Sequence, residues 1–424
     1  MPDYKRKKRR HFSAKPKTDR SKFAEKREKK NKIRFDDGTD TPKRKRSLTV
    51  LKGNKEELRK RWQRGLVIAL VIILTVVICE ITIPAGIPET ISTLVASFGS
   101  GNYPIEFDSS NTQNTVSKGG FYYVLTDGEI MAVTSGGKVI FSHNHGFENP
   151  VIKTSKTRAL LFNQGGNDVI IFNLNKVCST ITTEKEIINA AIGEDGSYAI
   201  ITGADSYVAA VNVYTKRDKL IYQWYSSSDM VNNVAIAPSG KKIAVSTLAT
   251  NVSGFNSKLM ILNFKSANPE FTKDYDGEII YDLSAASLRG VAVATANTYD
   301  FIRWHKYESK EYENEYNLQM LRESSKGALL VYNRENDKTD NRIVIISKKG
   351  EVKHQLRFNG IITDVAYKNN HIYCISDTKA YILDMEGKVI RTADCGFGVV
   401  RFSVVSQNEI AVVTDNAINV IKFE

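Results

Sequence analysis

One recurring unit constrains the fold of this chain more than any other feature: a polar or glycine-containing turn followed by a short apolar strand. The turns end at Gly120, Thr157, Gly196, Gly240, Gly290, Asn370 and Asn408. Measured in sequence positions, the spacings between successive turn ends are 37, 39, 44, 50, 80 and 38. A four-stranded blade of a β-propeller needs about 40–50 residues, and most of these spacings fall close to that length. Seven turns therefore predict seven blades.

The strands around these turns predict an all-β fold. They are short, rich in Val, Ile and Tyr, and separated by Gly, Asn, Asp and Ser. Such segments at close spacing are typical of all-β domains. A single four-stranded unit cannot bury both of its faces, so neighbouring units must stack radially. We therefore expect a seven-bladed β-propeller over residues 103–424.

The last repeat unit indicates how the ring closes. Residues 398–424 contain three strands and lack an outer one, whereas the segment Tyr103–Phe107 (YPIEF) lies just ahead of the first blade. Pairing of this segment with the last blade would complete that blade and cover an edge that otherwise invites aggregation. We predict closure of the ring by this pairing.

The long interval between Gly290 and Asn370 is the main irregularity in the repeat. In the seven-bladed interpretation it contains an insertion, Thr298–Gly327; an eight-bladed ring, which would divide the interval in two, is the alternative. Aromatic residues stand among charges in this insertion, and Trp and Tyr dominate the energetics of many protein interfaces. Two interpretations follow: a solvated flap that packs its aromatics on its own blade, or contact with a partner. The predicted contact residues are Trp304, Tyr307, Tyr312 and Tyr316.

The segment Leu66–Ile83 resembles a membrane span, with 18 residues and one ionisable group, Glu80. As a helix it would be about 27 Å long, close to the roughly 30 Å of a hydrocarbon core. Eight lysines and arginines lie in residues 45–64 and none follows before Lys118. This bias keeps the N-terminus in the cytoplasm. We expect a single-pass transmembrane helix over residues 65–84 that acts as a signal anchor, with a cleaved signal peptide as the alternative.

The charge of the chain is concentrated before this segment. Residues 1–64 carry 26 Lys and Arg against 9 Asp and Glu, and the remaining residues carry 34 against 38. With few aliphatic residues, residues 1–64 should be a disordered tail. Contact with anionic lipid of the inner leaflet needs no specific partner, whereas a cytoplasmic protein or a nucleic acid is the alternative. The propeller itself is not basic, so we do not expect it to bind nucleic acid.

Residues 85–102 should form a linker with a short amphipathic helix. Ile91, Leu94, Val95 and Phe98 lie at spacings that place them on one helical face, since residues three and four apart share a face. The helix could lie on the outer leaflet or dock beneath the propeller, and the sequence does not decide between the two.

Catalytic motifs are absent from the sequence, which lacks G-x-S-x-G, a P-loop, H-E-x-x-H and an EF-hand loop. His143 and His145 could face the same side of a strand end, but no third zinc ligand lies near them in the sequence. Three aspartates follow equivalent strands and could ring one surface, as the metal-binding carboxylates of lactonase-type propellers do, but loop capping is the simpler explanation; they are Asp127, Asp377 and Asp415. Four cysteines show no disulfide spacing, although Cys374 and Cys395 could pair. We predict no catalytic, cofactor or metal residues.

Two segments carry a resemblance to known repeats. Val234–Thr247 (VAIAPSGKKIAVST) and Ala190–Thr202 (AAIGEDGSYAIIT) resemble the strand, turn and strand of WD40-type and quinoprotein-like propeller repeats. The layout of basic tail, one span and degenerate propeller resembles a bacterial family of membrane-anchored propellers of unknown function. No Trp-Asp pair closes a blade and no Gly-His pair opens one, so the chain departs from the WD40 scaffold pattern.

These features favour a binding function over an enzymatic one. We expect a non-catalytic extracytoplasmic binding or scaffold propeller, tethered to the cell membrane, with a protein or an envelope polymer as its partner. The alternatives are a propeller enzyme with a site in the central channel, such as a hydrolase, a lactonase or a quinoprotein-like enzyme, and a sensor that signals through the basic tail.

Overall fold

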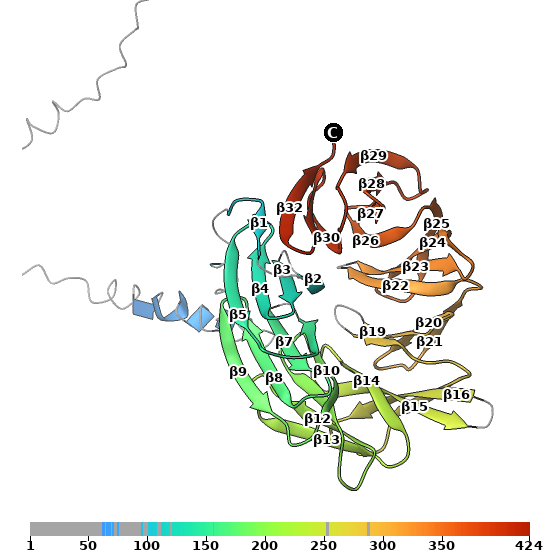
Figure 1. Cartoon of the computed structure of the whole chain (residues 1–424). Coiled ribbons are helices and arrows are strands. Elements are labelled where there is room, and N and C mark those ends of the chain that lie inside the picture. Colours follow the sequence, from blue (N-terminus) through green and yellow to red (C-terminus); the bar gives the residue numbers. More distant parts are fainter. Residues whose placement is uncertain are drawn as a thin grey trace, which may run out of the picture. The chain divides into compact units, whose positions relative to one another are not determined.

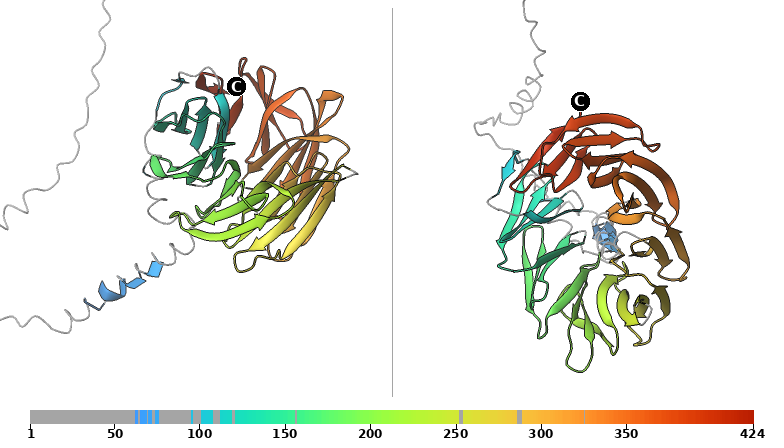
Figure 2. Two further views of the ribbon diagram at one scale, coloured as in Figure 1. Left: turned by 60° about the horizontal axis from the view of Figure 1, so that its bottom comes forward. Right: turned by 45° about the vertical axis from the view of Figure 1, so that its right-hand side comes forward.

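The structure, a computed structural model, describes residues 101–107, 112–118, 121–155, 157–251, 254–285, 289–324 and 326–424, together with helical positions at 62, 63, 65–68, 70, 71, 74, 75 and 95. Residues 101–424 form eight four-stranded antiparallel sheets that follow one another around a ring (Figures 1 and 2). The fold is therefore an all-β propeller, as predicted, but the predicted number of seven blades is wrong, because there are eight.

The strands of the first four blades follow chain order from the inside of the ring to the outside. Blade 1 contains β2 (Thr112–Lys118), β3 (Phe121–Thr126), β4 (Glu129–Thr134) and β5 (Val139–Asn144); blade 2 contains β6 (Pro150–Thr154), β7 (Arg158–Asn163), β8 (Asp168–Asn173) and β9 (Lys176–Thr182). Blade 3 contains β10 (Ile187–Ile192), β11 (Tyr198–Thr202), β12 (Ala209–Tyr214) and β13 (Leu220–Ser226); blade 4 contains β14 (Met230–Ile236), β15 (Lys242–Asn251), β16 (Gly254–Asn263) and β17 (Phe271–Asp276).

Blades 5 to 7 repeat the same order, and blade 8 departs from it. Blade 5 contains β18 (Asp282–Ser284), β19 (Gly290–Ala294), β20 (Thr298–Arg303) and β21 (Ser309–Glu313); blade 6 contains β22 (Asn317–Ser324), β23 (Gly327–Arg334), β24 (Asp337–Ser347) and β25 (Val352–Asn359). Blade 7 contains β26 (Ile362–Lys368), β27 (His371–Ser376), β28 (Lys379–Leu383) and β29 (Val389–Asp394); blade 8 contains β30 (Arg401–Ser406), β31 (Glu409–Val413), β32 (Ala417–Lys422) and β1 (Ile105–Glu106).

The core lies between neighbouring blades. The second strand of a blade is buried on both faces, as in β3 (FYYVLT) and β7 (RALLF), whereas the outer strand β9 alternates exposed and half-buried positions. One cluster joins Tyr123 and Leu125 of blade 1 to Leu161 and Phe172 of blade 2. Each blade thus buries apolar area that it could not bury alone, and this burial is the main favourable term in folding.

The predicted closure of the ring is confirmed. β1 pairs antiparallel with β32, with Ile105 opposite Ile418 and Glu106 opposite Ala417. Ahead of β1, the Tyr103 hydroxyl donates a hydrogen bond to the Ser135 carbonyl of blade 1 at 2.9 Å. The N-terminal segment therefore joins the last blade to the first, and the inner strands β30 and β2 lie in contact.

The predicted insertion, Thr298–Gly327, is regular blade structure. It supplies β20 and β21 of blade 5 and β22 of blade 6, so the long interval between Gly290 and Asn370 holds enough strands for two blades. The sequence SKEYE of β21 alternates exposed and half-buried positions, with Glu311 and Glu313 on the exposed side. An outer strand needs only one apolar face, which is why this segment resembles a polar loop in the sequence.

The structure does not bear out the predicted transmembrane helix. Within the part of the chain that the structure describes, no helix is both long and apolar enough to cross a membrane. Of the predicted span 65–84, only residues 65–68, 70, 71, 74 and 75 are described, and they are helical. The predicted tail, residues 1–64, and linker, residues 85–102, lie almost entirely outside the described residues.

Candidate functional site

The topology places two sets of loops on the same side of the ring. Four antiparallel strands alternate in direction, so the turn between the second and third strands lies at the same end as the connection to the next blade. We call this side the connection face. The turns between first and second strands, and between third and fourth strands, lie on the opposite face.

The connection face carries the exposed aromatic surface of the propeller. Across the described part of residues 101–424, five Phe, Tyr or Trp side chains count as exposed, and all five lie in its loops or at adjoining strand ends: Tyr207, Tyr225, Phe255, Tyr281 and Phe397. Phe397 is 89% exposed and Tyr281 is 61% exposed. Exposed apolar residues elsewhere, such as Val352 and Ile390, are aliphatic and begin outer strands on the opposite side. Such asymmetry is typical of a surface that binds a partner.

Part of this surface, which we call the aromatic patch, lies over blades 3 and 4. The rings of Tyr207 and Tyr225 stack with their centroids 4.7 Å apart, and the Val208 amide donates to the Ser226 carbonyl at 2.9 Å. Met230, 62% exposed, begins β14 four residues further along. The stacking and the backbone hydrogen bond hold the Tyr207 loop against the end of β13, while Tyr207 and Tyr225 stay 47% and 41% exposed.

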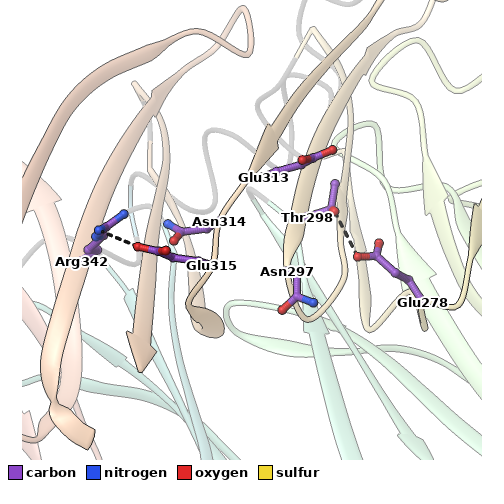
Figure 3. Close-up of a pocket in the computed structure, with 7 residues that line it drawn as sticks. All are labelled: Glu278, Asn297, Thr298, Glu313, Asn314, Glu315 and Arg342. Carbon is purple, nitrogen blue, oxygen red and sulfur yellow. Dashed lines mark hydrogen bonds and ion pairs between the residues drawn. The ribbon is translucent and has the colours of Figure 1, made fainter. Parts of the chain in front are cut away.

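An open polar pocket of about 600 Å³ lies on the same face, over the end of blade 5. Figure 3 shows its two sides: Arg342 pairs with Glu315 at 3.1 Å on one side, and Thr298 donates to Glu278 at 3.1 Å on the other. The lining residues are Glu278, Asn297, Thr298, Glu313, Asn314, Glu315 and Arg342. Three carboxylates against one guanidinium make this pocket acidic.

The inner strands of blades 3 to 5 are joined by amide side chains. Asn189 donates to the Asn232 carbonyl at 2.9 Å and to the Asn233 amide oxygen at 3.1 Å. Asn232 and Asn233 both donate to the carbonyl of Ile280, which precedes β18, at 3.0 and 3.1 Å. Inner strands of different blades share no ladder, so these side chains provide their lateral hydrogen bonds. We call Asn189, Asn232 and Asn233 the amide half of the inner belt.

The inner strands of blades 6 to 8 are joined by charges instead. The Arg322 Nε donates to Asp364 Oδ1 at 2.8 Å, and an Arg401 nitrogen lies 3.5 Å from the same oxygen. The other carboxylate oxygen of Asp364 accepts the Phe402 amide at 3.2 Å. The Asp364 side chain is 4% exposed, against 28% for Arg322 and 32% for Arg401. Burial, and then the charge of Arg322, lower the pKa of Arg401. These three residues form the charged half of the inner belt.

Bulges explain why both halves occur at the same level of the ring. In β10, β14 and β26 one residue is skipped in the pairing with the second strand, immediately before Asn189, Asn233 and Asp364 respectively. A bulge re-aims the side chains beside it. Each of these polar residues then reaches the inner strand, or the residue just ahead of it, in the next blade.

A further carboxyl group, Asp282, lies on the inner strand β18. Burial raises the pKa of Asp282, and the charge of Lys153 on the inner strand of blade 2 offsets this in part. This carboxyl group therefore lies between the amide half and the charged half of the belt.

The structure separates the four residues predicted to contact a partner. Trp304 and Tyr316 are 4% and 1% exposed and belong to the cores between blades 4 and 5 and between blades 5 and 6. Tyr307 and Tyr312 are half-buried, and Tyr307 stacks on Phe271. Partner contact by these residues stays a prediction, for which Tyr307 and Tyr312 retain side-chain surface.

The histidines and cysteines singled out in the sequence lie in ordinary surroundings. His145 is buried; its Nε2 lies 3.2 Å from the Thr126 carbonyl, and its Nδ1 accepts the Phe147 amide. Cys374 and Cys395 are both free thiols. Among the residues that the structure describes, no group of three or more His, Cys, Asp or Glu side chains is placed to hold a metal ion.

Sequence reasoning missed the connection-face aromatics and the charged half of the belt. The sequence separations from Arg322 to Asp364 and from Asp364 to Arg401 are each close to the length of one blade. Polar residues recurring in the first strand of each unit were therefore the available signal. Tyr207, Tyr281 and Phe397 stand in turns, where no core requires an aromatic residue.

Comparisons with known proteins agree with this fold. Residues 101–423 match the model of DUF5711, described as a family of unknown function. The C-terminal WD40 domain of Sif2 is similar with a TM-score of 0.51, at 9% identity, covering 77% of this chain and 100% of that one. Dihydro-heme d1 dehydrogenase NirN in complex with DHE gives a TM-score of 0.51 at 11% identity, and the match covers 76% of this chain and 78% of that one. BamB from Moraxella catarrhalis gives a TM-score of 0.48 at 13% identity, and the match covers 76% of this chain and 99% of that one. No curated protein sequence matches the chain. At these identities the likeness extends to the fold alone.

Proposed function

The chain belongs to the DUF5711 family, whose function is unknown, and from this premise we propose that it is a non-catalytic binding propeller whose connection face docks a protein partner. One observation carries the proposal: the five exposed aromatic side chains of the described propeller all lie on that face. Tyr and Phe provide large contact areas with little side-chain entropy to lose, so they anchor interfaces efficiently.

The acidic pocket on the connection face favours a partner with basic residues. The pocket over the end of blade 5 contains three carboxylates and one arginine. A partner that packs apolar residues on the aromatic patch and presents lysine or arginine toward the pocket would match both parts. Complementary charge of this kind chiefly raises the association rate and the specificity.

The location of the propeller is the part of the proposal that depends on the sequence alone. Residues 45–64 contain eight lysines and arginines, and residues 65–117 contain none. This distribution supports a propeller outside the cytoplasmic membrane. Cys178 of β9 is an exposed natural thiol, so a membrane-impermeant maleimide should label it in intact spheroplasts. Labelling should be lost in Cys178→Ser. Labelling that requires lysis would contradict the proposed location.

Site-specific photocrosslinking in the native cell tests the docking face. A photoreactive residue replacing Tyr281 should give one discrete protein adduct, whereas the same residue replacing Ile390, which is exposed on the opposite side, should give none. With the crosslinked protein purified, the double variant Met230→Ser/Tyr281→Ser should weaken binding at least tenfold, and the matched variant Val352→Ser/Ile390→Ser should not. Equal adducts from both faces would refute a dedicated docking face.

A further inference from the structure

We propose that Arg322 and Arg401, at the charged half of the inner belt, form a binding site for a ligand that carries a carboxylate or phosphate oxyanion. The starting observation is that two guanidinium groups from blades 6 and 8 share one oxygen of a single carboxylate, Asp364 Oδ1. The cluster therefore holds one positive charge in excess, although the propeller portion of the chain has more acidic than basic residues.

The two arginines are not equally satisfied. Arg322 donates from Nε to Asp364 and from an Nη nitrogen to the Leu321 carbonyl. Arg401 lies 3.5 Å from Asp364, a distance too long for a good charge-assisted hydrogen bond. Within the described residues, no hydrogen bond involves its guanidinium. Since Arg401 is two-thirds buried, water cannot fully replace a partner. A guanidinium presents up to five donors in a planar fork, a geometry that matches an oxyanion.

Arg401 lies at the connection-face end of its strand. Arg401 is the first residue of β30, and the first strand of each blade begins on that side. Ile361 and Phe397, exposed by 51% and 89%, stand three and four residues ahead of Asp364 and Arg401 in the connections that enter β26 and β30. A ligand could therefore pair its oxyanion with the two arginines and pack an apolar portion beside these side chains.

Nearby charges favour this end of the belt over the rest. The groups facing Arg401 from the adjoining inner strands are Arg322 and Asp364, and Asp364 is already engaged by Arg322 and by the Phe402 amide. In the amide half, the inner strands β10 and β14 contain no charged residue. Among the residues of the inner belt, an anion would thus be attracted only by Arg322 and Arg401.

Thermal unfolding of the full-length chain tests the proposal with simple probes. Sodium phosphate and sodium malonate, each compared with sodium chloride at equal ionic strength, should raise the Tm in a saturable manner, because a ligand that binds the folded state stabilises it. Arg401→Gln should raise the apparent dissociation constant for both anions at least tenfold. The matched surface variant Arg217→Gln, in the exposed turn before β13, should leave it unchanged.

Further variants separate binding from a merely structural role. Asp364→Asn removes the competing carboxylate and keeps an acceptor for the Phe402 amide, so it should tighten anion binding. If Arg401→Gln does not fold, Arg401→Lys keeps the charge but loses the planar fork, and it should still weaken binding. A response to phosphate alone would identify a phosphate site, and a response to malonate alone a carboxylate site. Equal Tm increases in Arg401→Gln and the unsubstituted chain would overturn the proposal, since the cluster would then be only an ion pair between blades. These outcomes do not depend on the protein partner proposed above.

Discussion

The two halves of the inner belt solve the same structural problem with different chemistry. Adjacent blades are not joined by backbone ladders, so their inner strands need side chains to connect them. In blades 3 to 5 the connectors are neutral asparagines, whose amides donate to carbonyl and amide oxygens of the next blade. In blades 6 to 8 they are Arg322, Asp364 and Arg401.

This difference separates inner strands whose connecting groups are fully paired from inner strands that keep an unbalanced positive charge. A hydrogen bond between an amide and a carbonyl joins two neutral groups, so the amide half carries no net charge that could attract an ion. The charged half leaves an excess guanidinium that no described carboxylate balances. Buried ionic groups are weak contributors to stability, so retention of a charged triad where asparagines serve elsewhere favours a role in recognition.

The largest expected effect comes from removing the shared carboxylate. Asp364→Ala leaves two arginines facing one another without an anion, and it leaves the Phe402 amide without its acceptor. Breaking a buried charged pair in this way costs about 3 kcal/mol or more, so the midpoint of urea unfolding should fall markedly. Asp364→Asn, which removes the charge but keeps an acceptor, should cost clearly less. An alanine variant as stable as the unsubstituted chain would show that the charged half does not join the blades.

A smaller loss is expected in the amide half. Asn233→Ala removes the hydrogen bond to the Ile280 carbonyl and one acceptor for Asn189, while Asn232 continues to donate to Ile280. The net value of such neutral hydrogen bonds is about 0.5–1.5 kcal/mol each, so the free energy of unfolding should fall by about 1–2 kcal/mol.

Gln223→Ala provides the matched control for this amide substitution. Its side chain is exposed on the outer strand β13 and donates to Asn212 of β12. Water can replace the lost partner there, and the loss should stay below about 0.5 kcal/mol. If Asn233→Ala proved as costly as Asp364→Ala, the distinction between the two halves would fail.

The sequence predicts the β-propeller because its turns and second strands repeat. The closure by Tyr103–Phe107 is also predictable, since the last unit lacks an outer strand and the first unit is preceded by a spare one. The eighth blade is harder to predict from strand patterns, because β21 carries charges on its exposed side and the first strand of blade 6, Asn317–Ser324 (NLQMLRES), lacks the β-branched residues that mark strands elsewhere. A strictly applied blade length would have divided the long interval between Gly290 and Asn370 in two.

The belt and the docking face depend on geometry that the sequence does not display. Arg322 and Arg401 meet through Asp364 only because inner strands converge on one axis and bulges set which side chain reaches the neighbouring blade. The aromatic residues Trp304 and Tyr316 were plausible contact residues in a polar loop, but the same residues fill cores once that loop is a pair of blades. Residue type alone therefore could not separate buried aromatics from exposed ones such as Tyr281.

The smallest expected effect of a substitution in the belt region lies at the boundary between the two halves. Asp282 has a folded-state pKa raised by burial, so its ionisation opposes folding, and stability should increase as the pH falls through that raised pKa toward the ordinary value of about 3.9. Asp282→Asn removes this charge from a half-buried position and places an amide on the inner strand of blade 5. We expect a gain of about 1 kcal/mol at pH 7, measured by urea unfolding. The gain should vanish at a pH below the unfolded-state pKa, where the carboxyl is protonated in both states. A loss of stability at pH 7 would instead show that attraction between Asp282 and Lys153 outweighs the cost of burying the carboxylate. The inner strand of blade 5 would then belong with the charged half of the belt.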